Sequence, residues 1–136
     1  MLKYIIFITF STLLYGCNKA PSERITDCTK SQCITLENQK ASITIETKSI
    51  LVEQLYTFHI SSSEPISQIY IESINMDMGK IPLHIDEQPN SKHKYKYKGQ
   101  FMLGICSEPK MVWQFVIHYQ NETREKIIFE SSWKQN

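Results

Sequence analysis

The side chains with the most distinctive chemistry in this chain carry sulfur and lie in its second half: Met76, Met78, Cys106 and Met111. Thioethers and thiolates are soft donors, which favour Cu(I) over hard cations. On an extended strand, residues two apart project from the same face, so Met76 and Met78 would present both thioethers to one ion. If the strand that bears Met111 lies opposite, the spacing permits a Cu(I) site, with Cys106 as a further sulfur ligand.

Core packing is the other interpretation of the same residues. Methionine fills irregular gaps in hydrophobic cores, and two methionines on one face of a sandwich strand more often pack than bind metal. Trp113 and Phe115 could simply pack against the sulfurs. His84 and His59 are candidates for a fourth ligand, but the residues alone favour packing.

A family resemblance gives more weight to metal binding than the residues alone do. Residues 75–113 resemble small exported β-sandwich proteins of the YtkA/FixH-like group, which are associated with copper handling and cytochrome-oxidase assembly. The shared elements are a Met-x-Met-Gly segment, a nearby proline, a Gly-x-aromatic strand and a late Met/Trp strand, here Met76–Gly79, Pro82, Gly99–Phe101 and Met111–Trp113. Ile81 stands where some members carry another methionine, which removes one soft ligand. The resemblance implies a Cu(I)-binding module, to which Cys106 adds a sulfur unless a disulfide consumes it.

Alternation of apolar and polar residues dominates the chain that must position these sulfurs. It runs through residues 41–45, 56–60, 69–71, 81–85, 93–97, 111–119 and 127–133. Seven or eight short strands at this spacing predict an all-β fold, an antiparallel Ig-like or cupredoxin-like β-sandwich. No run of helical periodicity follows Cys17. The strand that begins at Met111 has the longest apolar face and should lie in the centre of a sheet.

The first residues resemble a bacterial lipoprotein leader. An apolar run over residues 4–14 follows Lys3 and is too short to span a bilayer. Leu14-Tyr15-Gly16-Cys17 resembles a lipobox, which implies cleavage before Cys17 and acylation of that cysteine. We therefore expect a signal peptide over 1–16, a lipidated N-terminus and tether over 17–30, and a β-sandwich domain over 31–136. Asn18 is not the Asp that resembles an inner-membrane retention signal, so a periplasm-facing anchor in the outer membrane is favoured over the inner one.

Three cysteines remain once Cys17 is acylated: Cys28, Cys33 and Cys106. In an oxidising compartment they can form one disulfide and leave one thiol. A cross-link that closes a longer loop stabilises more, which favours a bond from Cys28 or Cys33 to Cys106. Of these two, Cys33–Cys106 is favoured because Cys33 directly precedes the first apolar stretch and can lie at a strand end. The Cys28–Cys106 bond and a Cys28–Cys33 bond, which would enclose only four residues, stay open as alternatives.

Charge and motifs exclude some classes of function. The chain has 15 basic and 14 acidic residues, a balance that argues against a nucleic-acid partner. Neither a Gly-x-Ser-x-Gly nor a His-Glu-x-x-His motif occurs, and we do not expect an enzyme. Two functions remain: a membrane-anchored Cu(I)-handling module linked to oxidase assembly, and a metal-free structural or adaptor lipoprotein that binds a protein partner in the envelope.

Overall fold

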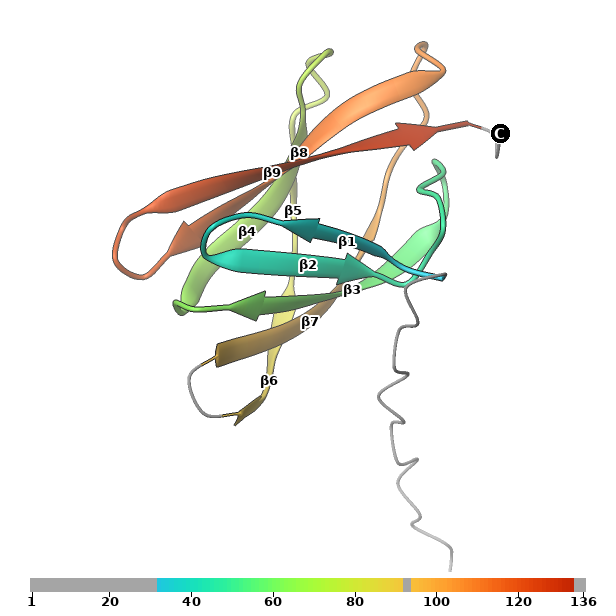
Figure 1. Ribbon diagram of the computed structural model, residues 1–136. Helices are drawn as coiled ribbons and strands as arrows, with labels where there is room; N and C mark the ends of the chain where they lie inside the picture. Colours follow the sequence, from blue (N-terminus) through green and yellow to red (C-terminus); the bar gives the residue numbers. More distant parts are fainter. Residues whose placement is uncertain (1–31, 92–93, 134–136) are drawn as a thin grey trace, which may run out of the picture.

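The computed structural model describes residues 32–91 and 94–133, which form two antiparallel sheets with no helix (Figure 1). The expected signal peptide, Cys17, the tether and Cys28 lie outside these residues, as do Lys92 and His93. Within the described part, no helix is long and apolar enough to cross a membrane. The predicted all-β antiparallel sandwich is confirmed.

The described residues contain nine strands. These are β1 (Ile34–Glu37), β2 (Ala41–Ile45), β3 (Leu55–Ser62), β4 (Ile66–Ser73), β5 (Lys80–Pro82), β6 (Ile85–Ser91), β7 (Lys94–Met102), β8 (Lys110–Tyr119) and β9 (Arg124–Ser132). One sheet has the order β1-β2-β3-β7-β6, and the other has the order β5-β4-β8-β9. β1 is only four residues long and β6 is polar, which is why the sequence predicted fewer strands.

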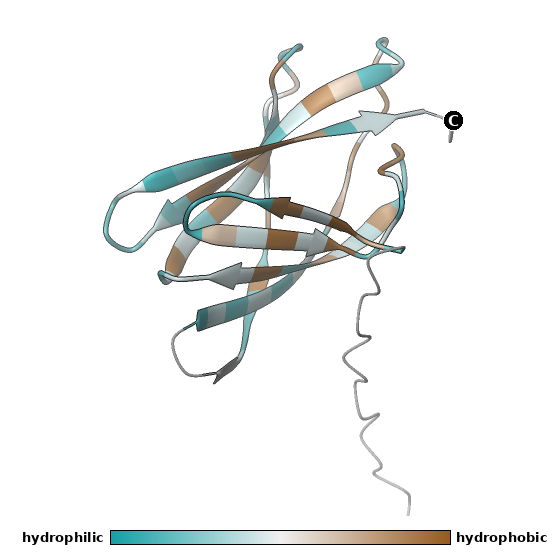
Figure 2. Cartoon of the chain, in the orientation of Figure 1, coloured by the Kyte–Doolittle hydropathy of each residue, from teal (hydrophilic) through white to brown (hydrophobic). Residues whose placement is uncertain are grey.

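Alternating side chains from both sheets fill the space between them. In β2 every second residue is buried, and Figure 2 shows hydrophobic and hydrophilic residues alternating along the strands. Four phenylalanines form the centre of the core: Phe58, Phe101, Phe115 and Phe129. The rings of Phe58 and Phe115 lie 5.9 Å apart and join the two sheets, and those of Phe115 and Phe129 stack at 4.7 Å. Such ring pairs add to the free energy gained by burying their area.

β8 lies inside its sheet, between β4 and β9, as its sequence predicted. Its inward residues from Met111 to Tyr119 are all almost fully buried. The strand predicted over 81–85 is divided instead. β5 pairs with β4 in one sheet, the Leu83 amide donates to the Ile69 carbonyl, and β6 then pairs with β7 in the other sheet.

Antiparallel pairing collects the connections at two ends of the sandwich. The loop end comprises loops 46–54, 74–79 and 103–109, the start of β1 and residues 132–133, and it lies at the upper right of Figure 1. Backbone hydrogen bonds join its parts: Glu53 to Leu103 at 2.8 Å, Ser132 to Ile50 at 3.0 Å. The turn end comprises the tight turns 38–40, 63–65 and 120–123, on the left of Figure 1.

Candidate functional site

The methionine pair lies in a loop of the loop end, and the prediction of an extended strand through it is wrong. β4 ends at Ser73, and residues 74–79 return the chain to β5. The Gly79 amide donates to Asp77 Oδ1 at 3.3 Å, and Gly79 has a φ of 72°, a left-handed conformation that glycine adopts without steric cost. The backbone turns here because β5 must pair antiparallel with the strand that has just ended.

The two thioethers of the pair have different surroundings. Met76 is half-buried and packs against the hydrophobic core, whereas Met78 is 36% exposed. The expected arrangement, with both thioethers on one strand face, is therefore not formed. Met76 is the member of the pair that the fold holds in place.

Met111 lies beneath this end of the molecule as the first inward residue of β8. It is 1% exposed, so its side chain belongs to the core. The Asn75 side chain ties the methionine loop to the residues on either side of Met111. Its Oδ1 accepts from the Val112 amide at 3.1 Å, and its Nδ2 donates to the Lys110 carbonyl at 3.5 Å. The loop of Met76 is thereby fixed beside the start of β8.

Cys106 reaches the same end from the loop that leads into β8. It is a half-buried free thiol that packs against the core, with its Sγ 3.9 Å from Ser107 Oγ. A free Cys106 excludes the expected Cys33–Cys106 disulfide, and that prediction is wrong. The reason lies in the strand order. Cys33 precedes β1, which two strands separate from β7, where the Cys106 loop begins. At the usual strand spacing this is roughly 14 Å, whereas a disulfide needs Cα atoms within about 7 Å.

A buried hydroxyl without a partner lies next to the methionine loop. Ser73 is the last residue of β4 and pairs with Trp113, and its Oγ is buried with no hydrogen-bond partner among the described residues. It is two residues beyond Ile71, a core residue, so its side chain points toward the core as well. A buried hydroxyl without a hydrogen-bond partner lowers the stability of the fold by roughly 1–3 kcal/mol. A group that hydrogen-bonds to Ser73 would therefore stabilise this position.

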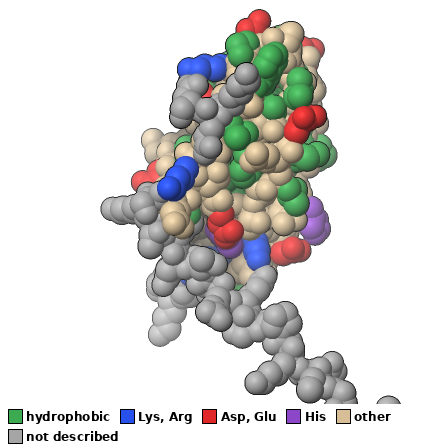
Figure 3. All heavy atoms as spheres, turned by 90° about the vertical axis from the view of Figure 1, so that its right-hand side faces the viewer, with side chains coloured by type: hydrophobic (Ala, Val, Ile, Leu, Met, Phe, Trp, Pro, Cys, Tyr) green, Lys and Arg blue, Asp and Glu red, His purple; other side chains and the backbone are tan. Residues whose placement is uncertain are grey.

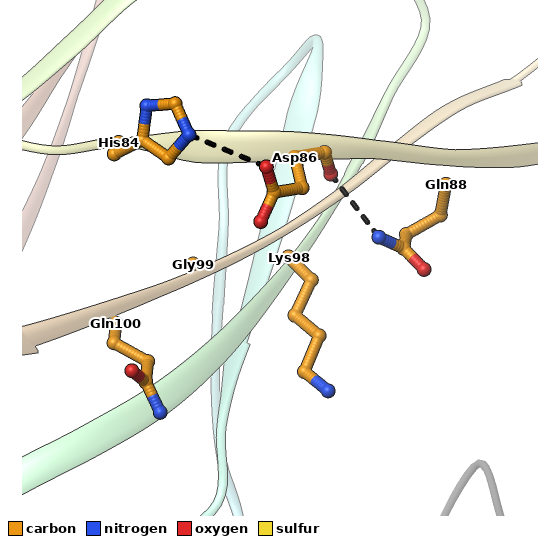
Figure 4. A pocket seen from close by; sticks show the side chains of 6 residues that line it. All are labelled: His84, Asp86, Gln88, Lys98, Gly99 and Gln100. Carbon is orange, nitrogen blue, oxygen red and sulfur yellow. Dashed lines mark hydrogen bonds and ion pairs between the residues drawn. The ribbon is translucent and has the colours of Figure 1, made fainter. Parts of the chain in front are cut away.

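The two histidines proposed as fourth ligands are paired with carboxylates. His59 Nε2 lies 2.8 Å from Glu46 Oε1, and His84 Nε2 lies 3.3 Å from Asp86 Oδ1. His84 lines a shallow depression of about 440 Å³ beside β6 and β7, and no sulfur residue lines it (Figure 4). The remaining lining residues are Asp86, Gln88, Lys98, Gly99 and Gln100. The structure therefore does not bring either histidine to the sulfur residues.

The turn end has a polar network in place of sulfur. Lys40 Nζ lies 2.9 Å from Glu64 Oε1 and donates to Thr123 Oγ1 at 3.1 Å. The Tyr119 hydroxyl donates to Glu125 Oε2 at 2.9 Å, and burial together with this carboxylate raises the pKa of Tyr119. Every one of these side chains has a partner of opposite charge or of hydrogen-bonding character.

The soft donors thus come from two loops and one strand start, all at the loop end. Across residues 32–91 and 94–133, no group of three or more His, Cys, Asp and Glu side chains could hold a metal ion, so a metal site here would have to use thioethers. The sequence pointed to Met76, Met111 and Cys106 but missed Ser73 and Asn75. The Asn directly before the Met-x-Met segment was the only signal, and asparagine often caps strand and turn ends.

Comparisons of this chain with known protein families, with curated proteins and with solved structures found no match.

Proposed function

We propose that this chain is a lipid-anchored module of the bacterial envelope that binds Cu(I) at its loop end. Met76, Cys106 and Met111 are the proposed ligands, and Met78 is a fourth donor that covers the ion from the solvent side. One observation carries the proposal. The free thiol of Cys106 and the thioether of Met76 both rest half-buried on the core, at the end where Met111 begins β8.

The donor set suits a soft monovalent ion. One thiolate with two or three thioethers matches the preference of Cu(I) for sulfur. The charge of one thiolate also cancels the charge of Cu(I), so the loaded site would be neutral, and a neutral group costs far less to bury than a bare cation. The unpaired Ser73 hydroxyl supports the same location, because it could donate to a thiolate at this end.

The proposed biological role follows from the sequence resemblances. Acylation of Cys17 would hold the module on a membrane, on the periplasmic side and in the outer membrane where the cell has one. The module would hold Cu(I) or pass it on during cytochrome-oxidase assembly. Cys33 is not a free thiol, and we propose that it pairs with Cys28 at the base of the tether. Mass spectrometry of a non-reduced digest would identify this disulfide and the acyl groups on Cys17.

A competition titration tests the metal site. The acylated protein, purified in detergent without oxygen, competes for Cu(I) with a chromophoric chelator. The test variants are Cys106→Ser and Met76→Leu, and the matched control is Met102→Leu, which removes an exposed thioether at the end of β7. We expect Cys106→Ser to weaken Cu(I) binding by roughly tenfold or more, because even the loss of a residue that only orients a metal ligand has an effect of this size. Met102→Leu should leave Cu(I) binding unchanged.

Two results would overturn the proposal. One is a wild-type protein that takes no Cu(I) from the chelator. The other is a Cys106→Ser variant that binds Cu(I) as tightly as the Met102→Leu control does.

A further inference from the structure

Six of the seven exposed large hydrophobic residues among the described residues lie at the loop end. Their exposure ranges from 36% for Met78 to 65% for Leu55, and the other four are Ile74, Met102, Ile105 and Trp133. We call these six residues the apolar rim. Figure 3 looks at this side of the molecule, and several groups of hydrophobic side chains lie on its upper and right-hand surface, with acidic side chains among them. The seventh residue, Ile128, lies in the middle of β9.

Backbone contacts connect the segments that bear the apolar rim. Leu55 and Met102 are directly paired across β3 and β7, and the chain runs on from Met102 to Ile105. The Trp133 amide donates to the Pro109 carbonyl at 3.3 Å, at the other end of the same loop. The Ile74 amide donates to the Val112 carbonyl at 2.8 Å, which places the methionine loop beside the start of β8. A clustered apolar surface of this kind marks a contact site on a soluble domain.

The path of the chain indicates what this surface contacts. β1 begins at Ile34, which pairs with Ile45, the residue directly before loop 46–54. The chain therefore enters the sandwich at the loop end. Between Cys17 and Ile34 the extended chain can span at most roughly 55 Å, so an anchor at Cys17 keeps the sandwich within that distance of the bilayer. The loop end is the part of the sandwich to which this chain connects.

We propose that the loop end docks on the lipid bilayer, with the apolar rim at the level of the headgroups. This inference rests on the lipid anchor of the proposed function and not on its metal site. Leu55, Ile105 and Met102 would reach the boundary of the acyl chains, and Trp133 has the amphipathic ring that is enriched at membrane interfaces. The anchor raises the local concentration of bilayer at the apolar rim, so a weak intrinsic affinity is enough.

Charge at this end gives no reason to expect an electrostatic partner. Three lysines and four acidic residues are interspersed over the three loops and their edges: Glu46, Lys48, Glu53, Asp77, Lys80, Glu108 and Lys110. Docking should therefore depend on buried apolar area and change little with salt. It would also hold Met76 and Cys106 near the membrane surface, within reach of a membrane-embedded copper acceptor.

Depth-dependent fluorescence quenching tests the docking. The acylated full chain is reconstituted into vesicles of phosphatidylethanolamine and phosphatidylglycerol, with and without a headgroup-labelled nitroxide lipid. Trp113 is fully buried, so the difference between wild type and Trp133→Phe isolates the Trp133 emission. The matched control adds Ile128→Trp to Trp133→Phe, because Ile128 is comparably exposed but lies roughly 15 Å away along β9.

We expect the nitroxide lipid to quench Trp133 and to leave the tryptophan at position 128 unquenched. Equal quenching at both positions, or none at Trp133, would overturn the docking. Quenching of Trp133 in cell-derived membranes but not in protein-free vesicles would assign the apolar rim to a protein partner and overturn it as well. Mass spectrometry of Cys17 in the same sample separates these results from a failure of the anchor, and the copper titration is independent of both.

Discussion

The two ends of the sandwich cover the core with different kinds of side chain. At the turn end, Lys40, Glu64, Tyr119 and Glu125 pair with one another over short turns. At the loop end, long loops leave apolar side chains and a free thiol at the surface. Both ends close the same core, so stability alone does not account for the difference.

The contrast indicates that the ends face different surroundings. At the turn end, polar and charged side chains pair with one another, and their exposed parts can bond to water. The loop end has exposed apolar residues, which gain nothing from contact with bulk water. It also has soft donors and, among the described residues, a buried Ser73 hydroxyl without a hydrogen-bond partner. We infer that the loop end is the functional end of the molecule.

The largest effect should come from beneath the loop end. Met111→Ala removes a side chain that is 1% exposed, and we expect it to lower the free energy of unfolding by about 2–5 kcal/mol. Met111→Leu keeps the volume and should cost less than about 1.5 kcal/mol. Urea unfolding measures both. Met78→Ala is the control at the surface, and an equal loss of stability there would contradict the different burial of the two methionines.

A smaller effect is expected at the turn end. Tyr119→Phe removes the hydroxyl that donates to Glu125 at 2.9 Å, and the net loss should be roughly 0.5–1.5 kcal/mol. The same unfolding assay measures it, with Glu122→Gln in the exposed turn as a control. A neutral Tyr119→Phe would mean that the polar network does not hold this end together.

The pH dependence of that difference follows from the raised pKa of Tyr119. The unfolded tyrosine ionises above its ordinary pKa of 10.0, while the buried one stays protonated to higher pH. The contribution of Tyr119 is therefore complete below pH 10.0 and is lost as the pH rises further. The stability gap between wild type and Tyr119→Phe should narrow from pH 9 to pH 11, measured by urea unfolding. A gap that widens would have the wrong sign for a raised pKa.

The smallest effect on stability should come from the apolar rim. Ile105 is 56% exposed, and Ile105→Ser should change the free energy of unfolding by no more than about 0.5 kcal/mol. The same substitution should reduce self-association in detergent-free solution, which light scattering detects. A marked loss of stability would show that the apolar rim belongs to the core and is not a contact surface.

Sequence periodicity was sufficient for the regular part of the fold. The alternation from Met111 to Tyr119 correctly predicted a central strand, because each inward residue there is buried by a sheet on the other side. The spacing of two between Met76 and Met78 was misleading, because both residues lie in the loop between β4 and β5. In this loop the first methionine packs on the core and the second is exposed. Apolar residues two positions apart therefore do not by themselves indicate a paired strand.

Long-range pairing could not be predicted in the same way. The chain passes from one sheet to the other at Leu83 and His84, between two segments that the sequence joined into one strand. The disulfide prediction failed for a related reason. Whether Cys33 and Cys106 can meet depends on the order of β1, β2, β3 and β7 in the sheet, and local pattern does not encode that order.

X-ray absorption at the copper edge tests the central claim most directly. The acylated protein is loaded with one equivalent of Cu(I), and the nearest neighbours of the metal are measured for wild type, Cys106→Ser and Met102→Leu. The account predicts a shell of sulfur atoms that loses one neighbour in Cys106→Ser and is unchanged in Met102→Leu. A shell of nitrogen or oxygen atoms, or a sulfur shell unaffected by Cys106→Ser, would contradict it.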